Sequence, residues 1–369
     1  MNSSKIKKVR SSNLELYRII TMLMIIAHHF VVNSGVMETV LAHPGEANSY
    51  FLLVFVAWGK TGINCFVFIT GYFMCKSNIS LRKFLKLVIQ VWCYYILFYV
   101  IFIIAGQNTF SLYKTVRVLF PVKNMTDDFI SSFIVFYLFI PFLNVWMRAL
   151  TQRQHFWLAT LCFLVFSVAA SDPFIFSIRI NYVLHFIVLF IIASYIRFYG
   201  FPVRISHRGW GWLTLASVLL GALSVVVLNI LHIWRGGNPR GMDQFFFVAD
   251  SNKVLAMAVA LCSFMWFKDL KLRHVPLVNA LGGVTFGVLL LHANSDAMRR
   301  WLWQQTVDVP GHFNDPWLWA YAPGVILIIF GVCAGIDWCR QHWLEERMVN
   351  RVYGIVSGWP IVKRLKEIR

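Results

Sequence analysis

Charged residues are scarce in this sequence, and cysteines at metal-ligand spacing are missing. Only 14% of the 369 residues are charged, whereas 59% are hydrophobic, which is too apolar for a soluble core of this length. None of the seven cysteines forms a CxxC pair or a cluster with histidine. Neither a disulfide framework nor a zinc site is therefore supported. We also find no internal repeat and no low-complexity tract, which excludes a repeat array.

Long apolar runs dominate the chain instead. Runs of roughly 17–25 residues, the length that crosses a ~30 Å hydrocarbon layer, recur along it. They predict an all-α polytopic membrane protein with about ten transmembrane helices, at 14–34, 51–75, 84–105, 128–148, 155–171, 181–199, 211–233, 249–267, 278–296 and 318–338. No small-residue cleavage site follows the first run, so we expect a retained helix and not a signal peptide. We assign 1–340 to a transmembrane domain and 341–369 to a basic cytosolic tail.

The positive charges are distributed unevenly between the two ends of these helices. The N-terminus, the tail after Trp338 and the loops at 76–86, 148–153, 197–208 and 268–273 hold 23 Lys and Arg residues, and the opposite loops hold 8. By the positive-inside rule, this asymmetry predicts that both termini are cytosolic. Membrane insertion also accounts for the net charge of +18. We therefore expect the lipid bilayer, and not nucleic acid, as the partner of these charges.

The first predicted helix carries ionisable residues, which are costly inside a membrane and indicate function by default. Arg18 and His29 are eleven positions apart, so they share one face of a helix to within about 20° and differ in depth by about 16 Å. Arg18 would hold phosphate groups of an elongated donor at the cytosolic side, because its guanidinium is permanently charged and planar. His29, deeper, is the natural general base.

The same residues also allow non-catalytic interpretations. Arg18 could extend to the lipid headgroups, and the histidines could cap the outer interface. His28 points about 100° away from His29, so we expect that both cannot be central to one site. An interfacial position is the favoured interpretation for Lys60.

Four segments, in order, resemble membrane-bound acyltransferase family 3, also called the acyl_transf_3 or O-acetyltransferase family. An Arg or Lys, ten residues and then a His mark the first helix of that family, as in Arg18 to His29. The segment Gly59-Lys-Thr-Gly-Ile-Asn-Cys-Phe-Val-Phe-Ile-Thr-Gly-Tyr-Phe73 is similar to its second-helix block. Tyr137-Leu-Phe-Ile-Pro-Phe-Leu-Asn144 and Thr285-Phe-Gly-Val-Leu-Leu-Leu-His292 are similar to its later blocks.

The resemblance implies an O-acyltransferase that moves an acyl group, acetyl in most members, from acyl-coenzyme A to a hydroxyl of a cell-surface or exported carbohydrate. It implies that His29 and Arg18 are catalytic and that acetyl-CoA is a donor and not a permanently bound cofactor. The basic loop after the second helix is similar to the region implicated in donor binding, which gives Lys76, Arg82, Lys83 and Lys86. We expect no metal ion, a carbohydrate acceptor and a location in the bacterial plasma membrane.

This sequence departs from the family pattern at several positions. Leu87 and Gln90 stand where the family often has a pair of arginines, Asn64 stands where Asp is frequent, and Leu289 stands where Tyr is common. The donor-phosphate contacts must therefore differ here.

Three further residues are candidates for supporting or acceptor roles. His292 could orient the acceptor or hold the site, or could be an interfacial histidine beside Trp301 and Trp303. Tyr72 and Asn64 are better explained as hydrogen-bonding residues between helices than as chemical groups.

Two other classes of protein have comparable helices. A transporter or flippase for lipid-linked sugars would also place charges inside the membrane, but we find no inverted repeat. A polysaccharide polymerase is disfavoured because no predicted outer loop much exceeds twenty residues.

Overall fold

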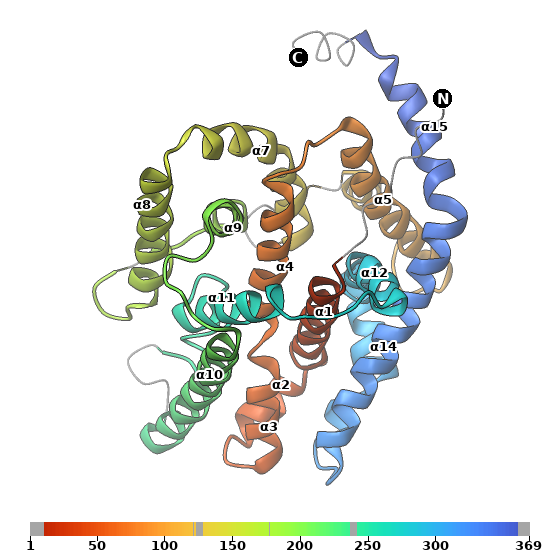
Figure 1. Ribbon diagram of the computed structural model, residues 1–369. Coiled ribbons are helices and arrows are strands. Elements are labelled where there is room, and N and C mark those ends of the chain that lie inside the picture. Colours follow the sequence, from red (N-terminus) through yellow and green to blue (C-terminus); the bar gives the residue numbers. More distant parts are fainter. Residues whose placement is uncertain (1–10, 121, 123–127, 177, 237–241, 361–369) are drawn as a thin grey trace.

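The computed structural model describes residues 11–120, 122, 128–176, 178–236 and 242–360, and all regular secondary structure in them is helical (Figure 1). Several predicted basic residues lie outside the described residues, namely Lys5, Lys7, Lys8, Arg10, Lys123 and Arg240, as does 361–369 of the predicted tail.

The helices divide by length. The long ones are α1 (Ser12–Val32), α4 (Gly59–Met74), α5 (Leu81–Ile104), α7 (Phe129–Ala149), α9 (Tyr182–Tyr199), α10 (His207–Arg235), α11 (Val254–Lys268), α12 (Pro276–His292) and α14 (Leu318–Arg340). The shorter ones are α2 (Val36–Ala42), α3 (Ala47–Val56), α6 (Leu112–Leu119), α8 (Gln152–Phe163), α13 (Asp296–Arg299) and α15 (Glu346–Ser357). Turns of π or 3-10 geometry follow some of them, at η1 (Leu164–Val168), η2 (Ala169–Ser171), η4 (Arg300–Thr306), η5 (Pro310–His312) and η6 (Gln341–Glu345).

Eight helical segments in the described part of the chain are long and apolar enough to cross a membrane. They are Ser12–Val32, Ala47–Met74, Leu81–Ile104, Phe129–Ala149, Gln152–Ser171, Tyr182–Tyr199, His207–Arg235 and Leu318–Ser357. Pro276–His292 and Asp296–His312 form a ninth if they are taken as one span, although they meet at a bend of 92°. Val254–Lys268 is apolar but shorter. The protein is therefore an all-helical polytopic membrane protein, and a helix stands at each of the ten predicted positions.

Helix α1 lies at the centre of the bundle, where it packs against α12, α4, α14 and α3 (Figure 1). Small residues allow this close packing, as is common between membrane helices. A Cβ atom at Gly62 of α4 would lie 2.9 Å from Cγ1 of Ile25 on α1. The buried second half of α1 joins α12 and α14 in one apolar cluster. The residues near His29 are thus held by several helices at once.

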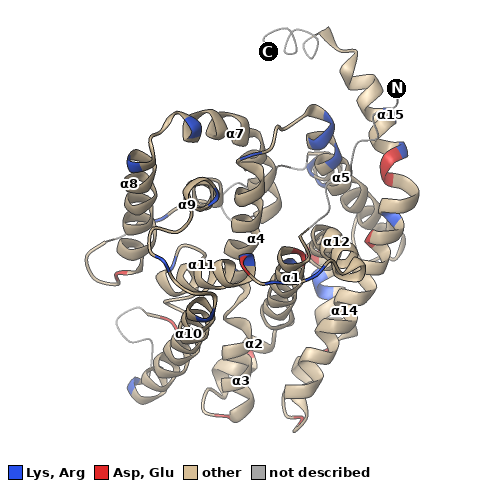
Figure 2. Ribbon diagram, in the orientation of Figure 1, with Lys and Arg blue, Asp and Glu red and all other residues tan. Residues whose placement is uncertain are grey.

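The C-terminal part of the chain continues α14 as one extended helical segment to Ser357. Its last helix, α15, rests on the first half of α5, where Val349 packs against Leu85 and Ile89. The predicted boundary at 340 therefore falls inside a continuous helical segment. Figure 2 shows Lys and Arg at the start of α5, the end of α7 and the start of α8, toward the side to which α15 extends.

Candidate active site

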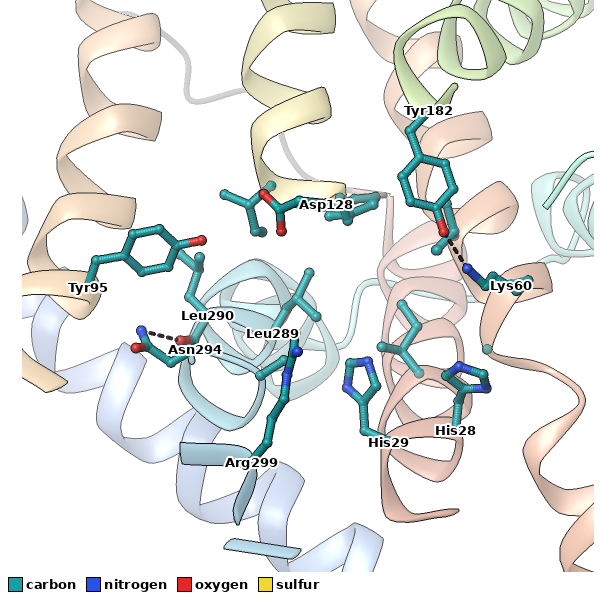
Figure 3. Close-up of a pocket in the computed structure, with 16 residues that line it drawn as sticks. His28, His29, Lys60, Tyr95, Asp128, Tyr182, Leu289, Leu290, Asn294 and Arg299 are labelled. Carbon is teal, nitrogen blue, oxygen red and sulfur yellow. Dashed lines mark hydrogen bonds between the residues drawn. The ribbon is translucent and has the colours of Figure 1, made fainter. Parts of the chain in front are cut away.

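A cavity of about 160 Å³ lies where the ends of several helices converge (Figure 3). The last turns of α1 contribute His28 and His29, and the first turn of α4 contributes Lys60. Polar side chains from four other segments complete its lining, namely Tyr95, Asp128, Tyr182, Asn294 and Arg299. We call this space the central cavity. Helix ends leave backbone groups without helical partners, so polar side chains are well accommodated there.

A chain of hydrogen bonds sets the proton positions on two histidines. Nδ1 of His292 lies 2.6 Å from the carbonyl oxygen of Val288, one turn earlier on α12. A carbonyl oxygen can only accept, so Nδ1 of His292 carries the hydrogen and the Nε2 of its neutral ring is an acceptor. Nδ1 of His29 lies 3.0 Å from that Nε2 and therefore donates to it. Neutral His29 is left with an unprotonated Nε2, the state required of a general base.

His28 also lines the central cavity, beside His29. The two rings have their centroids 5.8 Å apart. The break between α3 and α4 explains this position. It exposes the carbonyl oxygen of Val56, which accepts a hydrogen bond of 2.9 Å from Nδ1 of His28. Gly59 makes the room, because a Cβ there would lie 2.2 Å from Cγ of His28.

Two cations reach the central cavity from opposite walls. Lys60, which the sequence favours as interfacial, donates a hydrogen bond of 2.6 Å to the hydroxyl oxygen of Tyr182. Arg299, at the end of α13, points into the cavity (Figure 3). Asp128 caps α7 by accepting from the backbone N–H of Ser131 at 2.8 Å. Positive groups near a general base are suited to stabilise a developing oxyanion.

Two larger cavities adjoin the central one. One, of about 570 Å³, shares Tyr95, Asp128 and Arg299 with it. The other, of about 860 Å³, shares Lys60 and Tyr182 with it. The latter is lined by residues 172–176 and 178–180.

Asp172 and Lys253 line the cavity of about 860 Å³ and bond to backbone groups at its rim. Backbone N–H groups of Ile175, Phe176 and Phe174 bond to Asp172 and lower the pKa of its carboxyl. The ammonium of Lys253 donates to the carbonyl oxygen of Ala170 at 2.9 Å. The central cavity is thus flanked by two larger cavities with polar lining residues.

Arg18 does not line the central cavity. Its guanidinium lies 3.1 Å from the carboxylate of Glu15, which is buried, and above the ring of Phe73. The shared face of Arg18 and His29 therefore does not bring them into one pocket, because the helix rise between them is about 16 Å.

Arg82, Lys83 and Lys86, predicted to lie in a basic loop, stand in the first turns of α5, where two of them pair with the C-terminal helical segment. Arg82 forms an ion pair of 2.6 Å with Glu346, and Lys86 forms one of 2.5 Å with Glu345. The other two predicted donor-binding residues, Lys83 and Lys76, contact uncharged groups. Lys83 donates to the carbonyl oxygen of Asn78, and Lys76 lies over the ring of Phe198.

Asn64 and Tyr72 both bridge helices. The amide of Asn64 donates to the carbonyl oxygen of Ser251 at 2.6 Å and accepts from Nε2 of His185 at 2.7 Å. The hydroxyl of Tyr72 accepts from Arg197 at 2.8 Å. Both side chains thus hold α4 against neighbouring segments.

Arg299, Asp128 and Tyr95 line the central cavity but are missed by the sequence reasoning. Arg299 appears in the sequence only as one outer-loop charge among eight. A signal for Asp128 exists, because Asp before an apolar run is a common helix N-cap. No group of three His, Cys, Asp or Glu side chains among the described residues is placed to hold a metal ion.

The sequence pattern of the family described as Acyltransferase domain matches residues 11–338. Similarity searches find no match among curated proteins or among solved structures. The matched region contains every residue of the central cavity.

Proposed function

Because this chain belongs to acyltransferase family 3 and is a membrane acyltransferase, we propose that it transfers an acetyl group from acetyl-CoA to a hydroxyl of a carbohydrate. The observation that carries the proposal is the hydrogen-bond chain from Val288 through His292 to His29. It leaves one unprotonated imidazole nitrogen beside a cavity that two cations line.

The reaction follows from these groups. Nε2 of His29 takes the proton of the acceptor hydroxyl as its oxygen attacks the thioester carbonyl carbon. Arg299 and Lys60 stabilise the negative charge that develops on the carbonyl oxygen. The tetrahedral species then collapses, the carbon–sulfur bond breaks, and the sulfur of coenzyme A takes the proton from His29. The products are an acetyl ester and free coenzyme A, and the histidine returns to its initial state.

Donor binding belongs to the opposite side of the protein in this proposal. We place both termini in the cytosol of a bacterial cell and include α11 and α12 among ten crossings, as the positive charges suggest. Arg18 and the basic loop with Lys76, Arg82, Lys83 and Lys86 would then meet the phosphates of coenzyme A at the inner face. The cavities at the outer ends of the helices would receive the carbohydrate.

A transporter or flippase of lipid-linked sugars is the competing function. Movement of a sugar across the membrane breaks no covalent bond, so it requires no group that accepts the proton of a sugar hydroxyl. The free Nε2 of His29 beside two cations, in a chain of an acyltransferase family, therefore favours acyl transfer.

The test is label transfer by purified protein in liposomes, with labelled acetyl-CoA and candidate glycans. We expect His29→Ala to lower transfer by about 10²–10⁴-fold, the usual contribution of a general base. His274→Ala, which removes an exposed histidine far along the sequence, is the matched control and should transfer normally. Equal transfer by the wild type and His29→Ala contradicts the proposal.

Donor binding is tested separately by the dissociation constant of coenzyme A. We expect Arg18→Ala combined with Lys83→Ala to weaken binding, since each removes a positive charge from the proposed phosphate site. An unchanged dissociation constant would remove both residues from that site.

A further inference from the structure

The cavity of about 570 Å³ beside the central one is bounded by α5, α6, the start of α7 and the segment after α12. We call it the lateral cavity. It adjoins the central cavity, because six residues line both: Tyr95, Asp128, Ile130, Ala293, Asn294 and Arg299. A ligand in the lateral cavity would therefore lie next to the groups that surround His29.

The lateral cavity is cationic. Four basic side chains line it against two carboxylates, namely Lys114, Arg117, Arg299 and Arg300 against Asp128 and Asp296. Both carboxylates are already engaged. Asp296 pairs with Arg299 at 3.3 Å, and Asp128 caps the start of α7.

The other three cations have no carboxylate partner within the described residues. Lys114 donates to the side-chain oxygens of Asn108 and Thr109 at 2.8 and 3.2 Å. Arg117 donates to the hydroxyl oxygen of Tyr113 at 3.4 Å. Arg300 is exposed and makes no hydrogen bond or ion pair there. These side chains present three charges to whatever occupies the cavity.

Helix α6 places this cavity at a membrane surface. Lys114, Arg117 and Val118, which lie at helical spacings of three and four, line the cavity. The apolar side chains of Leu112 and Val116 on the same helix are exposed. A short helix with basic residues on one side and exposed aliphatic residues on the other is suited to lie at the headgroup level.

We propose that the lateral cavity binds a phosphate group of the acyl acceptor and so positions the neighbouring sugar hydroxyl beside His29. A phosphate ester carries up to two negative charges and three acceptor oxygens, which match three cations better than a single carboxylate does. Arginine also binds phosphate through two parallel hydrogen bonds. The phosphate belongs either to a lipid-linked sugar or to a soluble phosphorylated glycan. That the bound molecule is the acyl acceptor rests on the proposed acyl transfer, whereas binding of its phosphate does not.

Binding of simple probe ligands tests this site without any chemistry. Dissociation constants would be measured for glucose 1-phosphate, glucuronic acid and glucose with the detergent-purified protein. We expect the triple variant Lys114→Gln, Arg117→Gln and Arg300→Gln to bind glucose 1-phosphate at least tenfold more weakly, with unchanged affinity for glucose. The three side chains are exposed, so the fold should be retained. Wild-type binding of glucose 1-phosphate should also weaken with added salt.

The matched control removes three positive charges elsewhere, by Arg153→Gln, Arg204→Gln and Arg208→Gln. Equal loss of affinity in the control and the lateral-cavity variant overturns the site, as does wild-type affinity in the latter. Glucuronic acid binding as tightly as glucose 1-phosphate overturns the choice of phosphate.

A second measurement distinguishes the source of the phosphate and separates this inference from the catalytic one. A long-chain prenyl phosphate in nanodiscs would be compared with glucose 1-phosphate. Tighter binding of the first assigns the site to lipid-linked acceptors, and tighter binding of the second assigns it to soluble ones. His29→Ala should bind both probes as the wild type does. A failure of acyl transfer therefore leaves this result intact, and the reverse also holds.

Discussion

His29 and His292 are 263 positions apart in the sequence, yet Nδ1 of one lies 3.0 Å from Nε2 of the other. Because His292 is itself held by the carbonyl oxygen of Val288, we expect it to act as a positioning residue that fixes the tautomer of His29. We expect His292→Ala to lower kcat by about 10–100-fold, the usual effect of losing a partner that orients an imidazole. The KM for acetyl-CoA should change little.

The variant His292→Gln separates orientation from packing. The amide oxygen of glutamine can accept the hydrogen bond from Nδ1 of His29, so this variant should recover part of the activity that His292→Ala loses. Steady-state transfer of labelled acetyl groups measures both. Equal kcat values for the two variants would show that His292 only fills space.

The sequence predicts the helical membrane class and the approximate place of each long helix, because apolar length and charge asymmetry act locally along the chain. It does not predict the site as a whole. The contact between His29 and His292 depends on how α1 and α12 pack, and Arg299 enters the cavity because the chain bends by 92° after α12. Neither the packing of α1 on α12 nor the bend after α12 produces a recognisable pattern in the neighbouring sequence. The break between α3 and α4 was likewise hidden, since 47–74 reads as one apolar run.

Gly59 tests the position of His28. A Cβ at this residue would overlap the ring of His28, so Gly59→Ala must displace the ring and break its hydrogen bond to Val56. We expect a decrease in kcat/KM of up to about 100-fold, because small displacements at a reacting site are costly. The measurement is label transfer, with His28→Ala alongside to show how much of the loss belongs to that ring.

Gly45→Ala is the control for the added methyl group, because a Cβ at Gly45 meets no atom within 4 Å. It should retain wild-type activity. If Gly59→Ala also retains full activity, His28 has no part in shaping the central cavity.

Gly287 tests a buried polar network between α5, α12 and α14. Asp337 is fully buried and accepts hydrogen bonds from Tyr94 at 2.6 Å and from Arg340 at 2.7 Å. A Cβ at Gly287 would lie 2.0 Å from its carboxyl carbon. We expect Gly287→Ala to destabilise the protein by about 1–3 kcal/mol, the usual cost of overpacking. The midpoint of thermal unfolding in detergent measures the effect.

Gly331→Ala, in α14, provides the comparison. A Cβ there meets no atom within 4 Å, and alanine is the better helix former by about 1 kcal/mol. This variant should unfold at the same temperature as the wild type or a higher one. A Gly287→Ala protein that is equally stable would mean that the network can shift to admit a methyl group.

The last prediction concerns Glu346, which pairs with Arg82 at the start of α5. If Arg82 binds the phosphates of the donor, as proposed, Glu346 competes with the donor for its guanidinium. Both side chains are largely exposed, and such a pair is worth about 0.2–1 kcal/mol. We therefore expect Glu346→Gln to tighten coenzyme A binding by about two- to fivefold. The effect should shrink as salt screens the charges.

Titration calorimetry with coenzyme A measures the affinity, and Glu38→Gln, on α2, controls for the change in net charge. Weaker or unchanged binding by Glu346→Gln would mean that Arg82 serves only to hold α15 against α5, and the donor phosphates would then have to be met by other residues.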